Sequence, residues 1–138
     1  MSKKLALVTG GTRGIGAAIA KRLQEDGHTV VSTFIGHPEA AEAFSKETGI
    51  KTYKFDVAYF ESCQKAVQQI EQEMGQSIDI CINNAGITKD RFLHKRAVEE
   101  WNAVINTNLN SVFNVTRNVI EGMRKKSWGR IVNLSSVN

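Results

Sequence analysis

Hydrophobic residues in this chain fall into two patterns that alternate along its length. In the first pattern, short runs are rich in apolar residues or alternate apolar with polar ones. Runs of four to six residues bounded by glycine or polar residues are typical of strands, and mostly apolar ones of strands covered on both faces. This pattern predicts five strands, at residues 5–8, 30–35, 51–56, 78–82 and 131–134.

The second pattern is a stripe of apolar residues at three- and four-residue spacing, which predicts helices with one buried face. The first helix ends at Gly27, a residue type that often follows the last helical turn, and Pro38 suits the first turn of a second helix, at residues 38–48. The stripes of the other helices comprise Ile15, Ala18, Ile19 and Leu23; Cys63, Ala66, Val67, Ile70 and Met74; and, in a long helical region from about residue 98, Leu109, Val112, Phe113, Thr116, Val119, Ile120 and Met123. Alternating strands and helices predict an α/β fold with a parallel sheet and right-handed crossovers.

Composition favours a single globular domain over residues 1–138. The chain is 41% hydrophobic and 23% charged, as in ordinary globular proteins. Its net charge is +4 at pH 7. Because no basic cluster is interleaved with aromatic residues, we expect no nucleic-acid partner. A mildly basic surface also favours an acidic substrate.

The cysteines and the amino-terminal residues indicate the cellular compartment of the protein. Cys63 and Cys81 lack metal-ligand spacing and lie among apolar residues. We therefore expect no metal site and a reduced, cytoplasmic protein. The apolar run at residues 5–8 is too short for a signal peptide or a membrane span, so we expect no membrane association.

A glycine-rich segment, TGGTRGIG at residues 9–16, joins the first strand to the first helix. A dinucleotide needs a tight turn, a close backbone approach and helix amides directed at its pyrophosphate. Glycine permits the first two because it has no Cβ. The segment could be an ordinary strand–helix turn, but its place after the first strand favours cofactor binding.

The spacing of these glycines, with four further motifs, resembles the short-chain dehydrogenases/reductases. The turn matches their T-G-x3-G-I-G pattern and departs from G-x-G-x-x-G. The other motifs follow in the family's order between residues 4 and 138, namely Asp56-Val57, Asn83-Asn84-Ala85-Gly86, Asn108 in the long helix and Ser136 after the fifth strand. The resemblance implies a Rossmann-type doubly wound parallel sheet, with this chain supplying the first five strands in the order 3-2-1-4-5.

The resemblance also assigns the cofactor contacts. They are Gly10, Thr12, Arg13, Gly14, Ile15, Gly16, Thr33, Asp56, Val57, Asn84, Ala85, Gly86, Ile87 and Thr88. Among these, Asp56 is expected to contact adenine.

The second strand's end indicates which nicotinamide cofactor is used. NAD-binding proteins usually carry an acidic residue there, but residues 32–36 read STFIG. Without that carboxylate a 2′-phosphate is not repelled, and Arg13 can pair with it. The alternative is a merely solvated Arg13, but relatives with arginine at this place usually use NADPH, so we expect NADP(H).

Two catalytic residues are implied by the resemblance. Ser136 would donate a hydrogen bond to the developing oxyanion, for which a preplaced donor is needed. Asn108 would hold a water that connects the catalytic lysine to solvent. Judged from the residues alone, Ser135 and Ser136 are plain strand-end hydroxyls.

The family's catalytic tyrosine, and the lysine four residues after it, have no counterpart in this chain. The only tyrosines are Tyr53 and Tyr59, and four residues after them come Val57 and Cys63. We therefore expect this chain to be the amino-terminal part of a longer reductase and to be inactive alone.

Several segments resemble bacterial reductases of 3-oxoacyl thioesters. Residues 86–90, 101–109 and 128–138 look closest to those that reduce acetoacetyl-CoA to (R)-3-hydroxybutyryl-CoA, often for polyhydroxyalkanoate synthesis, and Asp90 would lie near the substrate. The alternative is reduction of acyl-carrier-protein thioesters in fatty acid synthesis. An alternative of another class is a non-catalytic nucleotide-binding remnant, which a Tyr-x3-Lys pair further along the reading frame would exclude.

Association is the last expectation. Relatives form tetramers and pair their long helices across an interface. The fifth strand would in addition present an open edge, which invites pairing with another chain. We expect a homo-oligomer, self-associating through the helix, the strand edge or both.

Overall fold

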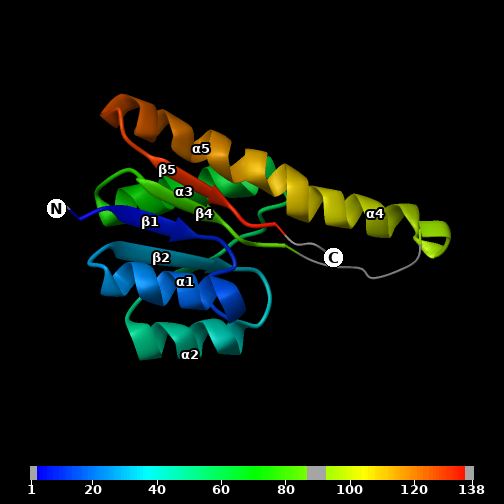
Figure 1. The fold of residues 1–138 in the computed structure, drawn as a ribbon, viewed down its shortest axis with the longest axis horizontal. Coiled ribbons are helices and arrows are strands. Elements are labelled where there is room, and N and C mark those ends of the chain that lie inside the picture. Colours follow the sequence, from blue (N-terminus) through cyan, green and yellow to red (C-terminus); the bar gives the residue numbers. More distant parts are fainter. Residues whose placement is uncertain (1–2, 87–92, 136–138) are drawn as a thin grey trace.

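A five-stranded parallel sheet forms the centre of the computed structural model, which describes residues 3–86 and 93–135 (Figure 1). Its strands are β1 (Leu5–Val8), β2 (Thr29–Phe34), β3 (Lys51–Lys54), β4 (Ile80–Asn83) and β5 (Arg130–Asn133). They lie in the order β3-β2-β1-β4-β5, and each neighbouring pair is parallel. The predicted Rossmann-type order is confirmed, with strand bounds that differ from the predicted ones by up to two residues, as assignments of strand ends often do.

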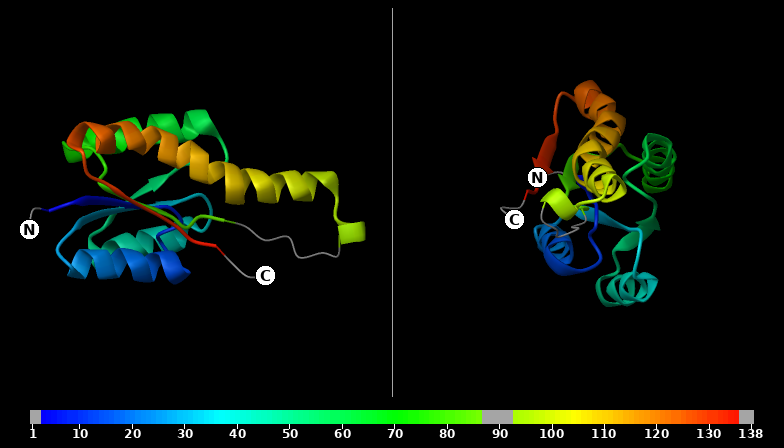
Figure 2. Two further views of the ribbon diagram at one scale, coloured as in Figure 1. Left: turned by 45° about the horizontal axis from the view of Figure 1, so that its top comes forward. Right: turned by 90° about the vertical axis from the view of Figure 1, so that its right-hand side faces the viewer.

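Helices cover both faces of this sheet (Figure 2). One face carries α1 (Gly14–Glu25) and α2 (Pro38–Thr48), and the other carries α3 (Phe60–Met74) and α5 (Ser111–Lys126). Successive side chains of a strand point to opposite faces. Leu5 and Leu7 of β1 accordingly pack with α3 and α5, whereas Ala6 and Val8 pack with α1. A central strand therefore has to be apolar at every position.

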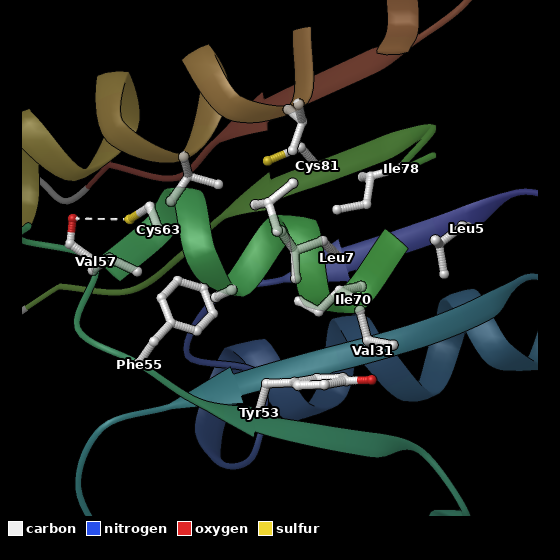
Figure 3. Close-up of a cluster of buried hydrophobic side chains, with 14 of the residues drawn as sticks. Leu5, Leu7, Val31, Tyr53, Phe55, Val57, Cys63, Ile70, Ile78 and Cys81 are labelled. Carbon is white, nitrogen blue, oxygen red and sulfur yellow. Dashed lines mark hydrogen bonds between the residues drawn. The ribbon is translucent and has the colours of Figure 1, made fainter. Parts of the chain in front are cut away.

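The core between the sheet and helices α3 and α5 contains both cysteines (Figure 3). Cys63 and Cys81 are fully buried and form no disulfide. Burial raises the pKa of each thiol to about 12. Both therefore stay protonated and act as small core residues, as their apolar neighbours in the sequence predicted.

The predicted long helix is divided into several segments. After a short 3-10 turn at Leu93–Lys95 come α4 (Val98–Val104), a π-helical segment at Ile105–Asn110, and α5. The prediction of one buried face is wrong at Leu109 and Phe113, which are 63% and 62% exposed. A π-helical turn changes the register of the faces that follow it. In addition, α4 and the π-helical segment extend past the ends of the strands, so no sheet covers them (Figures 1 and 2).

The stripe predicted for α1 is also wrong at its start. Ile15 is 68% exposed and Ala18 is exposed, whereas Gly16 and Ala20 are buried. The buried face is set by Gly16, which packs against the preceding turn so closely that a side chain at this position has no room.

At the amino-terminal edge of the sheet, Asp79 connects β1, β4 and α5. The Asp79 side chain is only 5% exposed. Its carboxylate accepts a hydrogen bond from the Leu5 amide at 2.9 Å and forms an ion pair with Lys126. Burial opposes ionisation, but these bonds hold the pKa of Asp79 below its ordinary value.

None of the helices in the described parts of the chain combines the length and hydrophobicity that a membrane span requires.

Candidate cofactor site at the carboxyl edge of the sheet

A cavity of about 290 Å³ lies at the carboxyl ends of the strands. Ligands of open parallel sheets bind at this edge, outside the strand ends. The cavity is lined by Gly10, Thr12, Arg13, Thr33, Phe34, Ile35, Gly36, His37, Phe55, Asp56, Val57, Ala85, Gly86 and Thr107. Residues from four loops, distant in sequence, thus meet at one place. Many of the residues predicted to bind cofactor are among them.

The glycine turn at the start of α1 has the backbone geometry that a pyrophosphate site needs. Gly14, the first residue of α1, has a φ of 57°, a left-handed conformation that glycine adopts without strain. A Cβ on Gly16 would lie 2.1 Å from the carbonyl oxygen of Gly10. Gly16 therefore lets α1 pack directly against the glycine turn, and a side chain on Gly14 would stand in open space, which leaves room for an anion near the amides of the first helical turn.

Thr9, which the sequence analysis did not assign to the site, fastens two of its loops together. Its hydroxyl oxygen accepts hydrogen bonds from the backbone amides of Asn84 and Ala85, each at 3.0 Å. The side-chain Nδ2 of Asn84 in turn donates a hydrogen bond to the carbonyl oxygen of Gly10 at 3.2 Å. The glycine turn and the segment after β4 therefore form one rigid unit. The signal was present in the sequence as the threonine of the T-G pair.

Thr33 of β2 and Asp56, in the turn after β3, support the cavity. Thr33 is buried, and its hydroxyl accepts a hydrogen bond from the Gly10 amide at 3.3 Å. Oδ1 of Asp56 accepts a bond from the Ala58 amide at 2.9 Å, and the Asp56 amide donates to the Ser62 hydroxyl at 3.1 Å. The Asp56 carboxylate is thus held at the cavity wall in a fixed turn.

The part of the wall that follows β2 contains no acidic side chain. Phe34, Ile35, Gly36 and His37 line the cavity there, and Arg13 lines the same cavity from the glycine turn. An arginine and a histidine without an acidic neighbour in this loop suit an additional phosphate better than a ribose hydroxyl alone.

Asn108 lies within the π-helical segment, next to the loop after β4. A Cβ on Gly86 would approach the side-chain Oδ1 of Asn108 to 3.0 Å. Thr107, its neighbour, lines the cavity. π-Helical turns occur frequently at functional sites, where they reposition a side chain. The helix interruption therefore brings Asn108 to the edge of the cofactor cavity.

The end of β5 is tied to its neighbours by Asn83. The side-chain Nδ2 of Asn83 donates to Oδ1 of Asn133 in β5 at 2.9 Å and to the hydroxyl of Thr116 in α5 at 3.1 Å. Ser135, which follows, is exposed. The predicted residues Ile87, Thr88, Asp90 and Ser136 lie outside the described residues.

The described residues around the cavity suit an organic ligand better than a metal ion. The described residues contain no group of three or more His, Cys, Asp or Glu side chains that could hold a metal ion. The residues present fit a dinucleotide, because a side chain on Gly14 would stand in open space at the start of α1, and a carboxylate and an arginine occupy the cavity wall.

Comparison with known proteins gives relatives for nearly the whole chain. The profile of the short chain dehydrogenase family matches residues 4–138. An acetoacetyl-CoA reductase of Paracoccus denitrificans is 53% identical over 135 residues, which cover 98% of this chain and 55% of the relative. One from Shinella zoogloeoides is 51% identical over 98% of this chain and 56% of its own length. A 3-oxoacyl-[acyl-carrier-protein] reductase of Vibrio harveyi is 44% identical over 97% of this chain and 55% of its own length. The chain therefore spans about half the length of these relatives.

Proposed function

Because this chain belongs to the short chain dehydrogenase family, we propose that it binds NADP(H) as part of an oxidoreductase that reduces acetoacetyl-CoA to (R)-3-hydroxybutyryl-CoA. One observation carries the proposal. Eight of the predicted cofactor residues, from four loops, line a single cavity, and Thr9 and Asn84 bond two of these loops together. A nicotinamide cofactor follows from the family, whereas the choice of NADP(H) rests on Arg13 and on the loop after β2, which has no acidic residue up to His37.

The chain's own residues suit the reduction of a carbonyl. When bound, a nicotinamide cofactor supplies the hydride for the carbonyl carbon. Ser136 would donate a hydrogen bond to the carbonyl oxygen as negative charge develops on it. Asn108 would hold a water in the path of the proton. A tyrosine followed by a lysine at the fourth residue does not occur in these 138 residues.

The substrate could be a thioester of coenzyme A or of acyl carrier protein. Relatives at 53% and 51% identity are acetoacetyl-CoA reductases, and one at 44% is a 3-oxoacyl-[acyl-carrier-protein] reductase. The higher identities favour the coenzyme A thioester, with Asp90 near the substrate. The acyl-carrier-protein thioester remains the second candidate, and the net charge of +4 would suit its acidic carrier.

We further propose a homo-oligomer in a reducing, cytoplasmic environment. The exposed apolar side chains of Trp101, Leu109 and Phe113 lie on one continuous helical region, as in a surface that a partner covers. The buried, unpaired Cys63 and Cys81 agree with a compartment that keeps thiols reduced.

Two measurements on the purified chain test the proposed function. Fluorescence titration is expected to show NADPH binding. Oxidation of NADPH is expected not to increase when acetoacetyl-CoA is added, because the members of a catalytic unit fail together when some are missing. Absence of NADPH binding would contradict the cofactor assignment. Thioester-dependent turnover by this chain would contradict the expected inactivity.

Extending the chain tests the activity itself. Joining residues 1–138 to a carboxyl-terminal segment that carries the Tyr-x3-Lys pair is expected to give NADPH-dependent reduction of acetoacetyl-CoA. Ser136→Ala in the joined protein should lower kcat strongly, while NADPH affinity stays unchanged. A joined protein that binds NADPH but reduces neither thioester would favour the non-catalytic nucleotide-binding alternative.

A further inference from the structure

A chain of hydrogen bonds connects helix α5 with the carboxylate of Asp56. Asn114 of α5 is 7% exposed, and its side-chain Nδ2 donates to the carbonyl oxygen of Val57 at 3.0 Å. The N–H of the same peptide group, on Ala58, donates to Oδ1 of Asp56 at 2.9 Å. One peptide group is thus held at both ends, by a buried helix side chain and by the carboxylate at the cavity wall.

The burial of Asn114 calls for a reason, because its neighbours are apolar. Val115 and Val119 of the same helix belong to the core between α3, α5 and the sheet. A buried amide is costly unless it is hydrogen-bonded. The Val57 carbonyl also accepts a contact from the Cys63 thiol at 3.6 Å, and a thiol is a weak donor (Figure 3). Asn114 is therefore the strong partner of this carbonyl.

We infer that Asn114 is a positioning residue for recognition of the adenine base, an inference that rests on the proposed function. Asn114 fixes the peptide between Val57 and Ala58, and that peptide engages Oδ1 of Asp56. Oδ2 of the same carboxylate is then left as the acceptor for the exocyclic amine of adenine. Both Asp56 and Val57 line the cavity. Asn114, a residue of α5 that does not line the cavity, thereby determines how strongly the chain prefers adenine over a base without the exocyclic amine.

A pair of cofactors that differ only in the base tests this inference. Titrations follow the nicotinamide fluorescence of NADPH and of deamino-NADPH, in which hypoxanthine carries a carbonyl in place of the amine. A hydrogen bond to a charged group gives the unmodified chain about a tenfold preference for NADPH. In Asn114→Ala and in the similarly sized Asn114→Leu, the preference is expected to fall to about twofold, because Asp56 is no longer held.

Matched variants separate positioning from general loss of structure. Asn118→Ala removes a side-chain amide of the same helix that donates to the backbone carbonyl of Asn114 at 2.7 Å, not to Val57. It should keep the full preference. Asp56→Asn should abolish the preference, and adding Asn114→Leu to it should change the ratio no further, since both changes act on one chain of bonds. Circular dichroism confirms that each variant is folded.

The outcomes distinguish this inference from the proposed function. A preference that persists in both Asn114 variants, including one in which both affinities fall in parallel, overturns the positioning role and leaves cofactor binding intact. Equal affinities in the unmodified chain overturn it as well. An unmodified chain that binds neither cofactor overturns the proposed function together with the inference. If neither Asn114 variant folds, a preference unchanged in Asp56→Asn overturns the inference, because the carboxylate that Asn114 positions then does not read the base.

Discussion

Arg13 stands at the amino-terminal boundary of α1, with its side chain exposed at the wall of the cofactor cavity. We predict that Arg13→Ala weakens binding of NADPH about tenfold or more and leaves NADH unchanged, because an arginine–phosphate contact contributes on the order of 1.5–3 kcal/mol. Titration of both cofactors against both proteins measures this. Arg22→Ala, on the same helix but away from the cavity, is the control. Equal affinities for NADPH and NADH in the unmodified chain would refute the assignment.

Glu73 illustrates a residue whose charge stabilises the fold. Its carboxylate accepts hydrogen bonds from Gln69 at 2.8 Å, Tyr53 at 2.8 Å and Lys51 at 3.2 Å. These bonds, the one from Gln69 first, lower the pKa of Glu73 to about 2. The folded-state pKa is lower than the unfolded one. The stabilisation is therefore present above the ordinary pKa of 4.5 and is lost as the pH falls toward about 2.

We predict that Glu73→Gln makes the free energy of unfolding less dependent on pH in the acid range. Urea unfolding at about pH 5.5 and about pH 3 should show a smaller loss of stability in the variant than in the unmodified chain. Glu42→Gln, which changes an exposed carboxylate 3.2 Å from Lys46, should leave the difference unchanged. An identical acid response in Glu73→Gln would show that the three hydrogen bonds are not maintained in solution.

Among the elements, helix α5 is bonded to the amino-terminal edge of the sheet through its last turn. Its carboxyl end reaches Asp79 through Lys126, and Asp79 also receives the Leu5 amide at the start of β1. We predict that Asp79→Ala costs about 1–3 kcal/mol, because the buried Leu5 amide loses its acceptor. Lys126→Met should cost less, since its side chain is 37% exposed. Urea unfolding gives the stabilities, and faster hydrogen exchange at the Leu5 amide identifies the cause. Equal losses in both variants would contradict this explanation.

The order and type of the elements could be predicted because each depends on a local signal. The bounds of α2 agree with the predicted 38–48, since Pro38 marks its start and Gly49, with a φ of 75°, its end. The π-helical segment could not be predicted, because a regular 3.6-residue period was assumed across residues 98–124. The wrong prediction that Leu109 is buried followed from that assumption.

For the candidate site, the motifs gave residue positions but not the walls between them. Asp56, Arg13 and Gly86 were chosen from the sequence, and the structure places them around one cavity. His37 and Thr107 line the same cavity and were missed. Which side chain of a loop faces a cavity depends on the backbone of that loop. His37, for instance, has a φ of 56°, which no local pattern indicated.

At the scale of the molecule, two apolar surfaces among the described residues are exposed to solvent. Phe113 stacks on Phe60 of α3 with ring centroids 6.1 Å apart, and Leu109 and Trp101 continue this surface along the helical region. Within the described residues, β5 pairs only with β4, and Val132 is 47% exposed. Exposed apolar patches and open strand edges both promote association.

We predict that the purified chain self-associates, and that two substitutions show which surface is used. Light scattering over a concentration series should give masses above that of one chain. Phe113→Glu should reduce the mass if the helical surface pairs, and Val132→Lys if the strand edge pairs. Arg117→Glu, a charge change at another exposed position of α5, is the control. A monomer at every concentration, with freely exchanging amides at Ile131 and Val132, would contradict the prediction.

The central position of β1 also affects how the chain folds as it is synthesised. The first strand made is flanked by β2, which follows soon after it, and by β4, which is made much later. Just before β4, Asp79 accepts the bond from the Leu5 amide, which joins residues 74 positions apart. Such long-range pairing slows folding. While the ribosome is still adding the segment up to β4, β1 has an unpaired apolar edge, which makes early intermediates prone to aggregation. We therefore expect yields to improve when translation is slowed by low temperature or when chaperones are co-expressed.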